Sequence, residues 1–518
     1  MGSDSQSVNQ ADWTALGRRW WSHVQVLADD KMEGRGTGSR GYERAANYVE
    51  ERFRAAGLHP AGIDGFRQPV AFHDSKVDRA HTTIELVREG KVQPIVLGDH
   101  AAILVNWETP ETVDAEAVFI GYGLSVPEAG YDDLAGENLK GKVAVLIRGG
   151  PTNVPGPIKA HGQSPEERAK ALRAAGAIGI ISILNPTVVD LPWPRLSSGV
   201  MEARLELMDP GPDGFHPLPF AVIWNHERAE VLFTGSGHTF KEAAAGIGSD
   251  RPLPHFPLAV RIRGKFKVKR QDVRCQNLVG VLPGADPSLK NEYVVVSAHL
   301  DHLGIGEPVD GDSIYSGAMD NASGVAALLH IAQRMKEDGT KPRRSVLFLA
   351  VTAEEKGLLG SEYFAGHPTV KGPIVANLNL DGLLPLCPFK HMEVQGLAES
   401  SLGDDIRVVC AQNGVEAHAE YEPDRVLFIR SDQYSFIRRG VPSLFPMYGY
   451  VQGSEDEKLF KAWTKDRYHA PSDDLDQPVD FGGAARFNNV MEEMVVRIAN
   501  ADTRPAWKAD SFFRRFAK

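Results

Sequence analysis

The sequence contains few cysteines, no long apolar run and no excess of positive charge. The three cysteines, Cys275, Cys387 and Cys410, are too few for a disulfide scaffold. No run of about 20 apolar residues occurs, so we expect no membrane-spanning segment. The 57 Lys and Arg residues against 68 Asp and Glu residues give a net charge of −11. This balance argues against nucleic acid or an anionic membrane as the main partner.

Length and composition predict more than one domain. The chain has 518 residues, whereas a single hydrophobic core stops growing at roughly 250–300 residues. Hydrophobic residues make up 42% of the sequence, which is ample for the cores. We therefore expect two domains.

The most informative segment is Ser297-Ala298-His299-Leu300-Asp301-His302. The apolar run from Tyr293 to Val296 directly before it is typical of a buried strand. Side chains alternate along a strand, so His299 and Asp301 should lie on the same side of its end. Two potential metal ligands would then face the same space.

Further acidic residues and one histidine follow at comparable places. Asp320 opens an amphipathic helix, and two apolar segments typical of strands, 346–351 and 374–380, end in Glu354-Glu355 and Asp381. His469 follows in a loop. Ligands gather beyond the carboxyl ends of strands in open α/β sheets, which is where all but the last of these residues fall.

The residue types suit a two-metal hydrolase. Imidazole nitrogen and carboxylate oxygen both bind first-row divalent metals, and two histidines with three carboxylates can hold two ions that share one carboxylate. One of Glu354 and Glu355 could then ligate while the other takes a proton from the attacking water. Each motif alone is weak, because a His-x-Asp pair is more often a hydrogen-bonded pair and a Glu-Glu pair is usually solvated. Their order and spacing together carry the prediction.

This set of motifs resembles the M28 family of co-catalytic zinc aminopeptidases, over most of the chain. The resemblance implies an α/β fold, with a mixed β-sheet flanked by helices. It also implies peptide substrates and two Zn²⁺ ions per chain, which Co²⁺ or Mn²⁺ could replace. Asp320 would bridge the two ions, His299 and Asp381 would complete one site, and Glu355 and His469 would complete the other.

The resemblance implies roles for other residues as well. Glu354 would be the general base, and Asp301 would orient the His299 ring. The Tyr468 hydroxyl would stabilise the developing oxyanion, with a packing role as the alternative. Members of the family hold the Asp320–Asn321 peptide bond in the cis form, so we predict a cis bond here.

Two departures from the family pattern are visible. Met319 stands where many members have an acid, but the ligand position after it is kept as Asp320. Gln433 replaces a histidine that is not one of the five ligands, which puts substrate contacts in doubt rather than metal binding. The remaining histidines in this half of the chain match no ligand position, and we expect them to be ordinary loop or helix residues: His302, His330, His367, His391 and His418.

Other activities stay open. A carboxypeptidase or dipeptidase on the same scaffold would keep every ligand and add a basic residue for the substrate carboxylate, for which Arg430 is the candidate. A glutaminyl cyclase is a further alternative. A non-catalytic, receptor-like relative would usually have lost ligands, whereas this chain keeps all five and the base.

The resemblance also divides the chain. Residues 13–111 and 256–505 would form the peptidase domain in two parts. Residues 112–255 alternate strand, helix and strand between proline-rich loops, which resembles an inserted protease-associated domain. That domain would either restrict entry to short peptides or serve as a spacer.

Two segments near the N-terminus call for comment. Gly34-Arg35-Gly36-Thr37-Gly38 superficially suggests a phosphate-binding loop, but it has no preceding strand and no P-loop lysine, so we expect a structural turn near the cleft. Met1-Gly2-Ser3 resembles a remnant of an expression vector, which often replaces a removed export signal. Because proteins of this architecture are commonly exported, we expect a periplasmic or secreted protein.

Overall fold

The chain forms two compact units. The computed structural model describes residues 10–188, 191–211, 214, 216–422, 425 and 427–517. Unit 1 comprises Met1–Val70, Arg274–Tyr421 and Arg430–Lys518, and unit 2 comprises Ala71–Val273 and Glu422–Ile429. Two strands, β2 (Arg67–Val77) and β14 (Val268–Leu282), run from one unit into the other.

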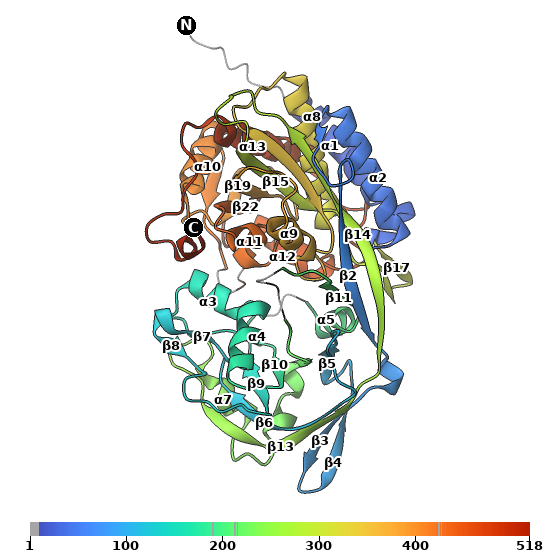
Figure 1. Ribbon diagram of the computed structural model, residues 1–518, viewed down its shortest axis with the longest axis vertical. Coiled ribbons are helices and arrows are strands. Elements are labelled where there is room, and N and C mark those ends of the chain that lie inside the picture. The colour runs from blue at the N-terminus through green and yellow to red at the C-terminus, as the bar shows by residue number, and fades with distance from the viewer. Residues whose placement is uncertain are drawn as a thin grey trace. The chain divides into compact units, whose positions relative to one another are not determined.

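Unit 1 is built on a mixed sheet, several of whose strands are labelled in Figure 1. The strand order of this sheet is β11-β2-β14-β18-β15-β19-β22-β20-β21, and β11 (Arg204–Leu207) pairs with residues 72–75 of β2. Strand β15 is parallel to both of its neighbours, β18 and β19, whereas β14 is antiparallel to β18 and β20 is antiparallel to β22. The other strands of this sheet are β1 (His59–Pro60), β15 (Tyr293–His299), β18 (Ser345–Val351), β19 (Ile374–Asn379), β20 (His391–Gln395), β21 (Glu416–His418) and β22 (Ser443–Tyr448). Strands β16 (Gly304–Val309) and β17 (Asp312–Tyr315) form a separate pair. The strands predicted from the apolar runs before the site residues are confirmed.

Helices flank this sheet, as the resemblance predicted. Three of them, α1, α8 and α13, pack against one another, and α8 and α13 also contact β15. Strand β18 is buried along its whole length, which explains its continuous apolar run. The helices of unit 1 that the structure describes are α1 (Gln10–Leu27), α2 (Arg40–Ala55), α8 (Ser323–Glu337), α9 (Leu359–Gly366), α10 (Ser401–Gln412), α11 (Gln433–Ile437), α12 (Glu455–Asp466) and α13 (Phe481–Asn500).

Unit 2 has its own sheet, in the order β4-β3-β13-β6-β9-β10-β12-β5, and its own hydrophobic core. The run β6-β9-β10-β12 is parallel and the outer pairings are antiparallel. The strands of this sheet are β3 (Thr83–Arg88), β4 (Lys91–Ile95), β5 (Ala101–Leu104), β6 (Thr112–Ile120), β9 (Val143–Ile147), β10 (Gly179–Ile183), β12 (Phe220–Trp224) and β13 (His255–Lys265). Strands β7 (Ser125–Val126) and β8 (Tyr131–Asp132) form a separate pair. Its helices, among the described residues, are α3 (Gly156–Gln163), α4 (Pro165–Ala174), α5 (Trp193–Val200), α6 (Glu230–Phe233) and α7 (Phe240–Ala243).

The boundaries of unit 2 differ from the expected 112–255. Unit 2 begins at Ala71, because β3, β4 and β5 pair within its sheet. It extends to Val273, because β13 pairs with β3 and β6 rather than returning to the first sheet. The alternation of strand and helix was visible in the sequence, but strand partners more than a hundred residues apart were not.

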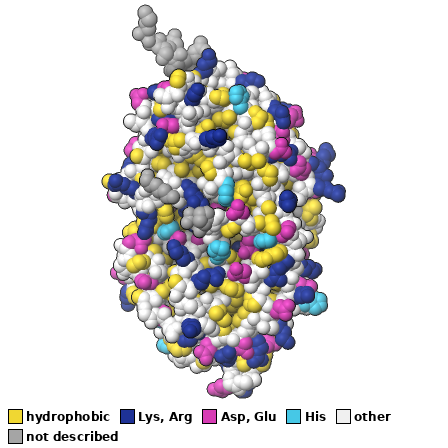
Figure 2. Space-filling model, in the orientation of Figure 1, with side chains coloured by type: hydrophobic (Ala, Val, Ile, Leu, Met, Phe, Trp, Pro, Cys, Tyr) yellow, Lys and Arg dark blue, Asp and Glu magenta, His cyan; other side chains and the backbone are white. Residues whose placement is uncertain are grey.

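The surface is mixed in charge. Figure 2 shows Lys and Arg side chains interspersed with Asp and Glu over the visible face. Among the described residues, no helix is long and apolar enough to cross a bilayer. Cys275, Cys387 and Cys410 are all buried free thiols.

Candidate metal centre

The sheet of unit 1 brings the predicted ligands together. His299 is the last residue of β15, the Glu354-Glu355 pair follows β18, and Asp381 follows β19. Because β18 and β19 flank β15 in parallel, their carboxyl ends meet at one edge. Asp320 joins them from the turn that precedes α8, and His469 joins them from the loop between α12 and α13.

The donor atoms form two groups around Asp320. His299 Nε2 lies 3.1 Å from Asp381 Oδ1 and 3.3 Å from Asp320 Oδ1. His469 Nε2 lies 3.2 Å from Asp320 Oδ2 and 3.2 Å from Glu355 Oε2. The two carboxylate oxygens of Asp320 thus face different histidines, which is the arrangement expected of a bridging ligand.

These distances fit a transition-metal ion. Zinc bonds nitrogen and oxygen at about 2.0–2.2 Å, so two ligands of a tetrahedral ion lie roughly 3.3–3.5 Å apart. The four separations of 3.1–3.3 Å are close to that spacing. Imidazole with carboxylate is also a donor set that zinc accepts.

The electrostatics point the same way. Burial lowers the pKa of His299, but the charges of Asp381 and Glu354 outweigh it and raise that pKa well above its usual value. Burial likewise opposes the shift of His469, whose pKa is raised to about 10 by Glu355 and Asp320. Buried carboxylates thus create a strongly negative potential, which a bound cation would neutralise.

The two adjacent glutamates have different surroundings. The Glu355 carboxylate contacts His469 through Oε2 and lies 2.6 Å from His302 Nδ1 through Oε1. The Glu354 carboxylate lies within 4.8 Å of donor atoms of His299 and Glu355. Burial raises the pKa of Glu354 well above its usual value, and although the His299 charge opposes this, Asp381 adds to it. Glu354 therefore holds a proton more readily than its neighbour.

The backbone of the centre is unusual in three places. The Asp320–Asn321 peptide bond is cis, which confirms the prediction. Ala353, directly before Glu354, has a φ of 56° and His469 has a φ of 54°. Left-handed backbone is uncommon for residues other than glycine and concentrates at functional sites.

Asp301 contacts the His299 ring through its main chain. His299 Nδ1 lies 3.1 Å from the Asp301 carbonyl oxygen, which fixes the ring with Nε2 facing Asp320 and Asp381. The Asp301 carboxylate instead accepts the Glu354 amide at 3.1 Å and the Thr37 hydroxyl at 3.2 Å. Asp301 thus links the end of β15, which carries His299, to the turn that carries Glu354.

Asp473 was missed as a positioning residue. Its carboxylate accepts the amides of Met319 and Asp320 at 3.0 Å each, and its carbonyl oxygen accepts the Ala318 amide at 3.0 Å. The turn that presents Asp320 is therefore held by the same loop that carries His469. Its place four residues after His469 was the available signal.

Arg35 was missed as well. It is fully buried, and its guanidinium donates to the carbonyl oxygens of Leu300 at 2.9 Å, Leu27 at 2.6 Å, Ser316 at 2.6 Å and Gly317 at 2.9 Å. The segments that follow His299 and precede Asp320 are thereby tied together. The glycine-rich segment around Arg35 is the structural turn that the sequence predicted.

His302 was expected to be an ordinary loop residue, but it lies against the cluster. It is fully buried, and neither ring nitrogen makes a hydrogen bond to any residue that the structure describes. Nδ1 nevertheless lies 2.6 Å from Glu355 Oε1, and a ligand atom of His302 lies within 4.8 Å of those of Asp320 and Glu355. A Cβ on Gly317 would lie 2.5 Å from this ring, so only glycine fits beside it.

Tyr468 and Arg430 both belong to unit 1. The Tyr468 ring lies 4.0 Å from that of His469, and Arg430 is exposed. Burial raises the pKa of Tyr468 well above its usual value; Asp320 adds to the shift and the Arg430 charge opposes it. The phenol therefore keeps its proton. Arg430 directly precedes Ser431, whose hydroxyl donates to Asp381 Oδ2 at 2.6 Å.

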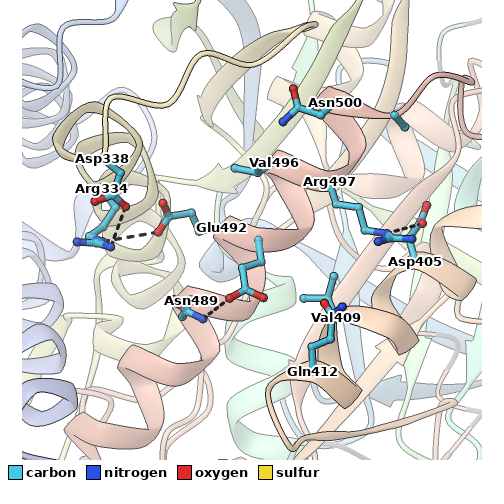
Figure 3. A pocket seen from close by; sticks show the side chains of 12 residues that line it. Arg334, Asp338, Asp405, Val409, Gln412, Asn489, Glu492, Val496, Arg497 and Asn500 are labelled. Atoms are coloured by element: carbon cyan, nitrogen blue, oxygen red, sulfur yellow. Dashed lines mark hydrogen bonds and ion pairs between the residues drawn. The ribbon is translucent and has the colours of Figure 1, made fainter. Parts of the chain in front are cut away.

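A separate cavity of about 690 Å³ lies among α8, α10 and α13 (Figure 3). Arg334 pairs there with Asp338 at 2.8 Å and approaches Glu492 at 3.7 Å. Burial raises the pKa of Glu492 to about 7. No predicted site residue lines this cavity, and it is distinct from the metal centre.

The segment that carries this centre is similar to known proteins. Residues 277–495 match the model of peptidase family M28. Leupeptin-inactivating enzyme 1 of Streptomyces exfoliatus is 34% identical over 168 residues, which are 32% of this chain and 34% of that enzyme. The probable glutamate carboxypeptidase VP8 of Zea mays is 27% identical over 281 residues, 52% of this chain and 36% of that protein. The chain thus spans about a third of the length of these relatives.

Solved structures share the fold over nearly the whole chain. The aminopeptidase from Aneurinibacillus sp. strain AM-1 has a TM-score of 0.57 at 19% identity, covering 97% of this chain and 99% of that one. The zinc aminopeptidase BSAP from Bacillus subtilis has a TM-score of 0.50 at 18% identity, covering 94% and 96%. At these identities the likeness establishes the fold alone.

Proposed function

Since the chain belongs to peptidase family M28 through residues 277–495, we propose that it is a zinc-dependent aminopeptidase that releases N-terminal residues from peptides. The observation that carries this proposal is the pair of donor groups that share Asp320 and lie beside Glu354. Two zinc ions per chain would be held, one by His299, Asp320 and Asp381 and the other by His469, Asp320 and Glu355. Co²⁺ or Mn²⁺ could take their place.

The proposed reaction is hydrolysis of the first peptide bond. When bound, the ions would polarise the scissile carbonyl and lower the pKa of the attacking water. Glu354 takes the proton of that water as general base and then gives it to the leaving amine. The raised pKa of Glu354, caused chiefly by its burial, supports this role, because a carboxyl group that holds a proton readily can both accept and return it.

Tyr468 would donate a hydrogen bond to the developing oxyanion. Its pKa, raised by burial, keeps the hydroxyl protonated at neutral pH, as a donor requires. Asp301 and Asp473 have positioning roles in this scheme, since their contacts fix the His299 ring and the Asp320 turn.

A matched set of peptides tests the proposal. A short peptide of at least three residues with a free N-terminal amine should be cleaved at its first peptide bond. The same peptide with an acetylated amine should resist cleavage. The products are identified by mass spectrometry. Equal rates on the two substrates would contradict an aminopeptidase.

A carboxypeptidase or dipeptidase is the second candidate. It is favoured by the exposed Arg430, which could bind a substrate carboxylate, and by the likeness to a probable glutamate carboxypeptidase. Amidation of the C-terminus should then abolish cleavage, and Arg430→Gln should raise KM for the free acid alone. If amidation has no effect, this candidate is excluded.

We further propose that unit 2 is a protease-associated domain. Its separate core and its parallel β9 and β10, connected through α3 and α4, support this assignment. Export to the periplasm or the medium is also a proposal. Cell fractionation with an antibody against the protein tests it.

A further inference from the structure

A second group of metal-ligating side chains lies at the edge of the sheet in unit 1, on strands β20 and β21. These strands are parallel, with His391 opposite Glu416 and Glu393 opposite His418. Ligand atoms of His391, Glu416 and His418 all lie within 4.8 Å of one another. No member of this group belongs to the centre described above. From the sequence, both histidines were expected to be ordinary loop or helix residues.

The distances within the group suit a small cation. His391 Nδ1 lies 3.0 Å from His418 Nε2, and Glu416 Oε2 lies 3.7 Å from the first nitrogen and 3.9 Å from the second. Ligands of a tetrahedral zinc ion are separated by roughly 3.3–3.5 Å, so one distance is slightly shorter and two are slightly longer. The three separations thus bracket the spacing of zinc ligands, and the pairing of β20 with β21 is what brings the three residues together.

The chemistry and exposure of the group also fit an ion. Two imidazoles and one carboxylate are donors that zinc accepts. The side chains of His391 and His418 are 20% and 25% exposed, and that of Glu416 is 69% exposed. Solvent can therefore reach the group and supply a fourth ligand. The two rings are tilted by 45° with centroids 5.2 Å apart, so they converge through their nitrogens instead of stacking.

We propose that His391, Glu416 and His418 form an additional zinc site that clamps β21 to β20. Strand β21 has three residues and lies at the sheet edge, so few ladder hydrogen bonds hold it. Three residues beyond His418 the chain leaves unit 1 at Tyr421. An ion bound here anchors the last part of the chain before that exit. This role is structural and independent of the proposed peptidase activity.

Zinc titration of the chelator-treated protein tests the site. The wild type should bind one equivalent more than the double variant His391→Gln/His418→Gln, measured by calorimetry. The matched control is His81→Gln. The His81 side chain is 73% exposed, and among the described residues its one ion-pair partner is Asp78. This variant should bind as the wild type does. Equal zinc stoichiometry in the wild type and the double variant would overturn the proposal.

A second measurement guards against misfolding of the variant. Crystals of the wild type grown with zinc should give an anomalous peak between His391 Nδ1 and His418 Nε2, in addition to density at the metal centre. A peak at the centre with none at β21 refutes the site. Zinc should also raise Tm further in the wild type than in the double variant, and an equal rise in both would count against a clamp.

Discussion

Replacing Glu354 by Gln separates proton transfer from metal binding. Glutamine has nearly the same shape as glutamate. The backbone N–H of residue 354 keeps its 3.1 Å hydrogen bond to the Asp301 carboxylate, so the turn should hold its geometry. The new side chain, however, cannot take a proton. We therefore expect Glu354→Gln to retain its metal while kcat falls by at least about 100-fold, the lower limit for losing a general base.

The adjacent residue supplies the matched control. A 100-fold loss corresponds to about 2.7 kcal/mol in activation free energy. Glu355→Gln changes a carboxylate that lies 3.2 Å from His469 and 2.6 Å from His302, so it removes a ligand instead of a base. That variant should lose about half of the metal at the centre, since it affects one of two ions.

Metal analysis by mass spectrometry and steady-state kinetics on a free-amine peptide distinguish the two variants. Both measurements should be made in the His391→Gln/His418→Gln background, so that zinc at the sheet edge does not enter the count. If Glu354→Gln loses metal, or turns over at a near-normal rate, then Glu355 is the general base and Glu354 is the ligand.

Three other predictions follow from the structure. Chelation should abolish activity, and in the background without the sheet-edge histidines full recovery should need about two zinc ions per chain; a fully active preparation with fewer than one would contradict the shared Asp320. Arg35→Met should lower the free energy of unfolding by roughly 3–4 kcal/mol, at about 1 kcal/mol for each carbonyl that loses its donor, and the exposed Arg40→Met is the control; equal urea midpoints would refute this. Burial is the main cause that raises the pKa of Glu492 from 4.5 to about 7. The contribution of Glu492 to the free energy of unfolding is therefore fully present below pH 4.5 and is lost as the pH rises through 7. The wild type should therefore lose up to about 3 kcal/mol of stability by pH 8 that Glu492→Gln keeps, and parallel pH profiles of Tm would exclude it.

Local patterns carried the prediction of the metal centre. Apolar runs predicted β15, β18 and β19, and a residue of the cluster comes after each run. These residues meet because parallel strands end at one edge of the sheet. The cis Asp320–Asn321 bond was predicted through the family resemblance and is confirmed. The mixed β-sheet flanked by helices was also predicted through this resemblance and is confirmed.

What the sequence did not reveal depends on distant partners. Arg35 lies in a glycine-rich turn, and its carbonyl partners Leu300 and Ser316 follow more than 260 residues later. His302 directly follows Asp301, yet its contact with Glu355 depends on how β15 and β18 align. His391 and His418 meet only because β20 and β21 are neighbours. No periodicity in a single segment encodes such pairings.

The position of Arg35 bears on how the protein folds while it is being made. Its hydrogen bond to Leu300 spans 265 residues of sequence, which at about 5–20 residues per second takes a ribosome roughly 13–53 seconds to complete. All of Ala71–Val273, with a core of its own, is synthesised in that interval. The Arg35 guanidinium of the nascent chain therefore cannot reach Leu300 until that residue has emerged. The Ala71–Val273 part of unit 2 can fold before then, whereas Glu422–Ile429 of the same unit is made later.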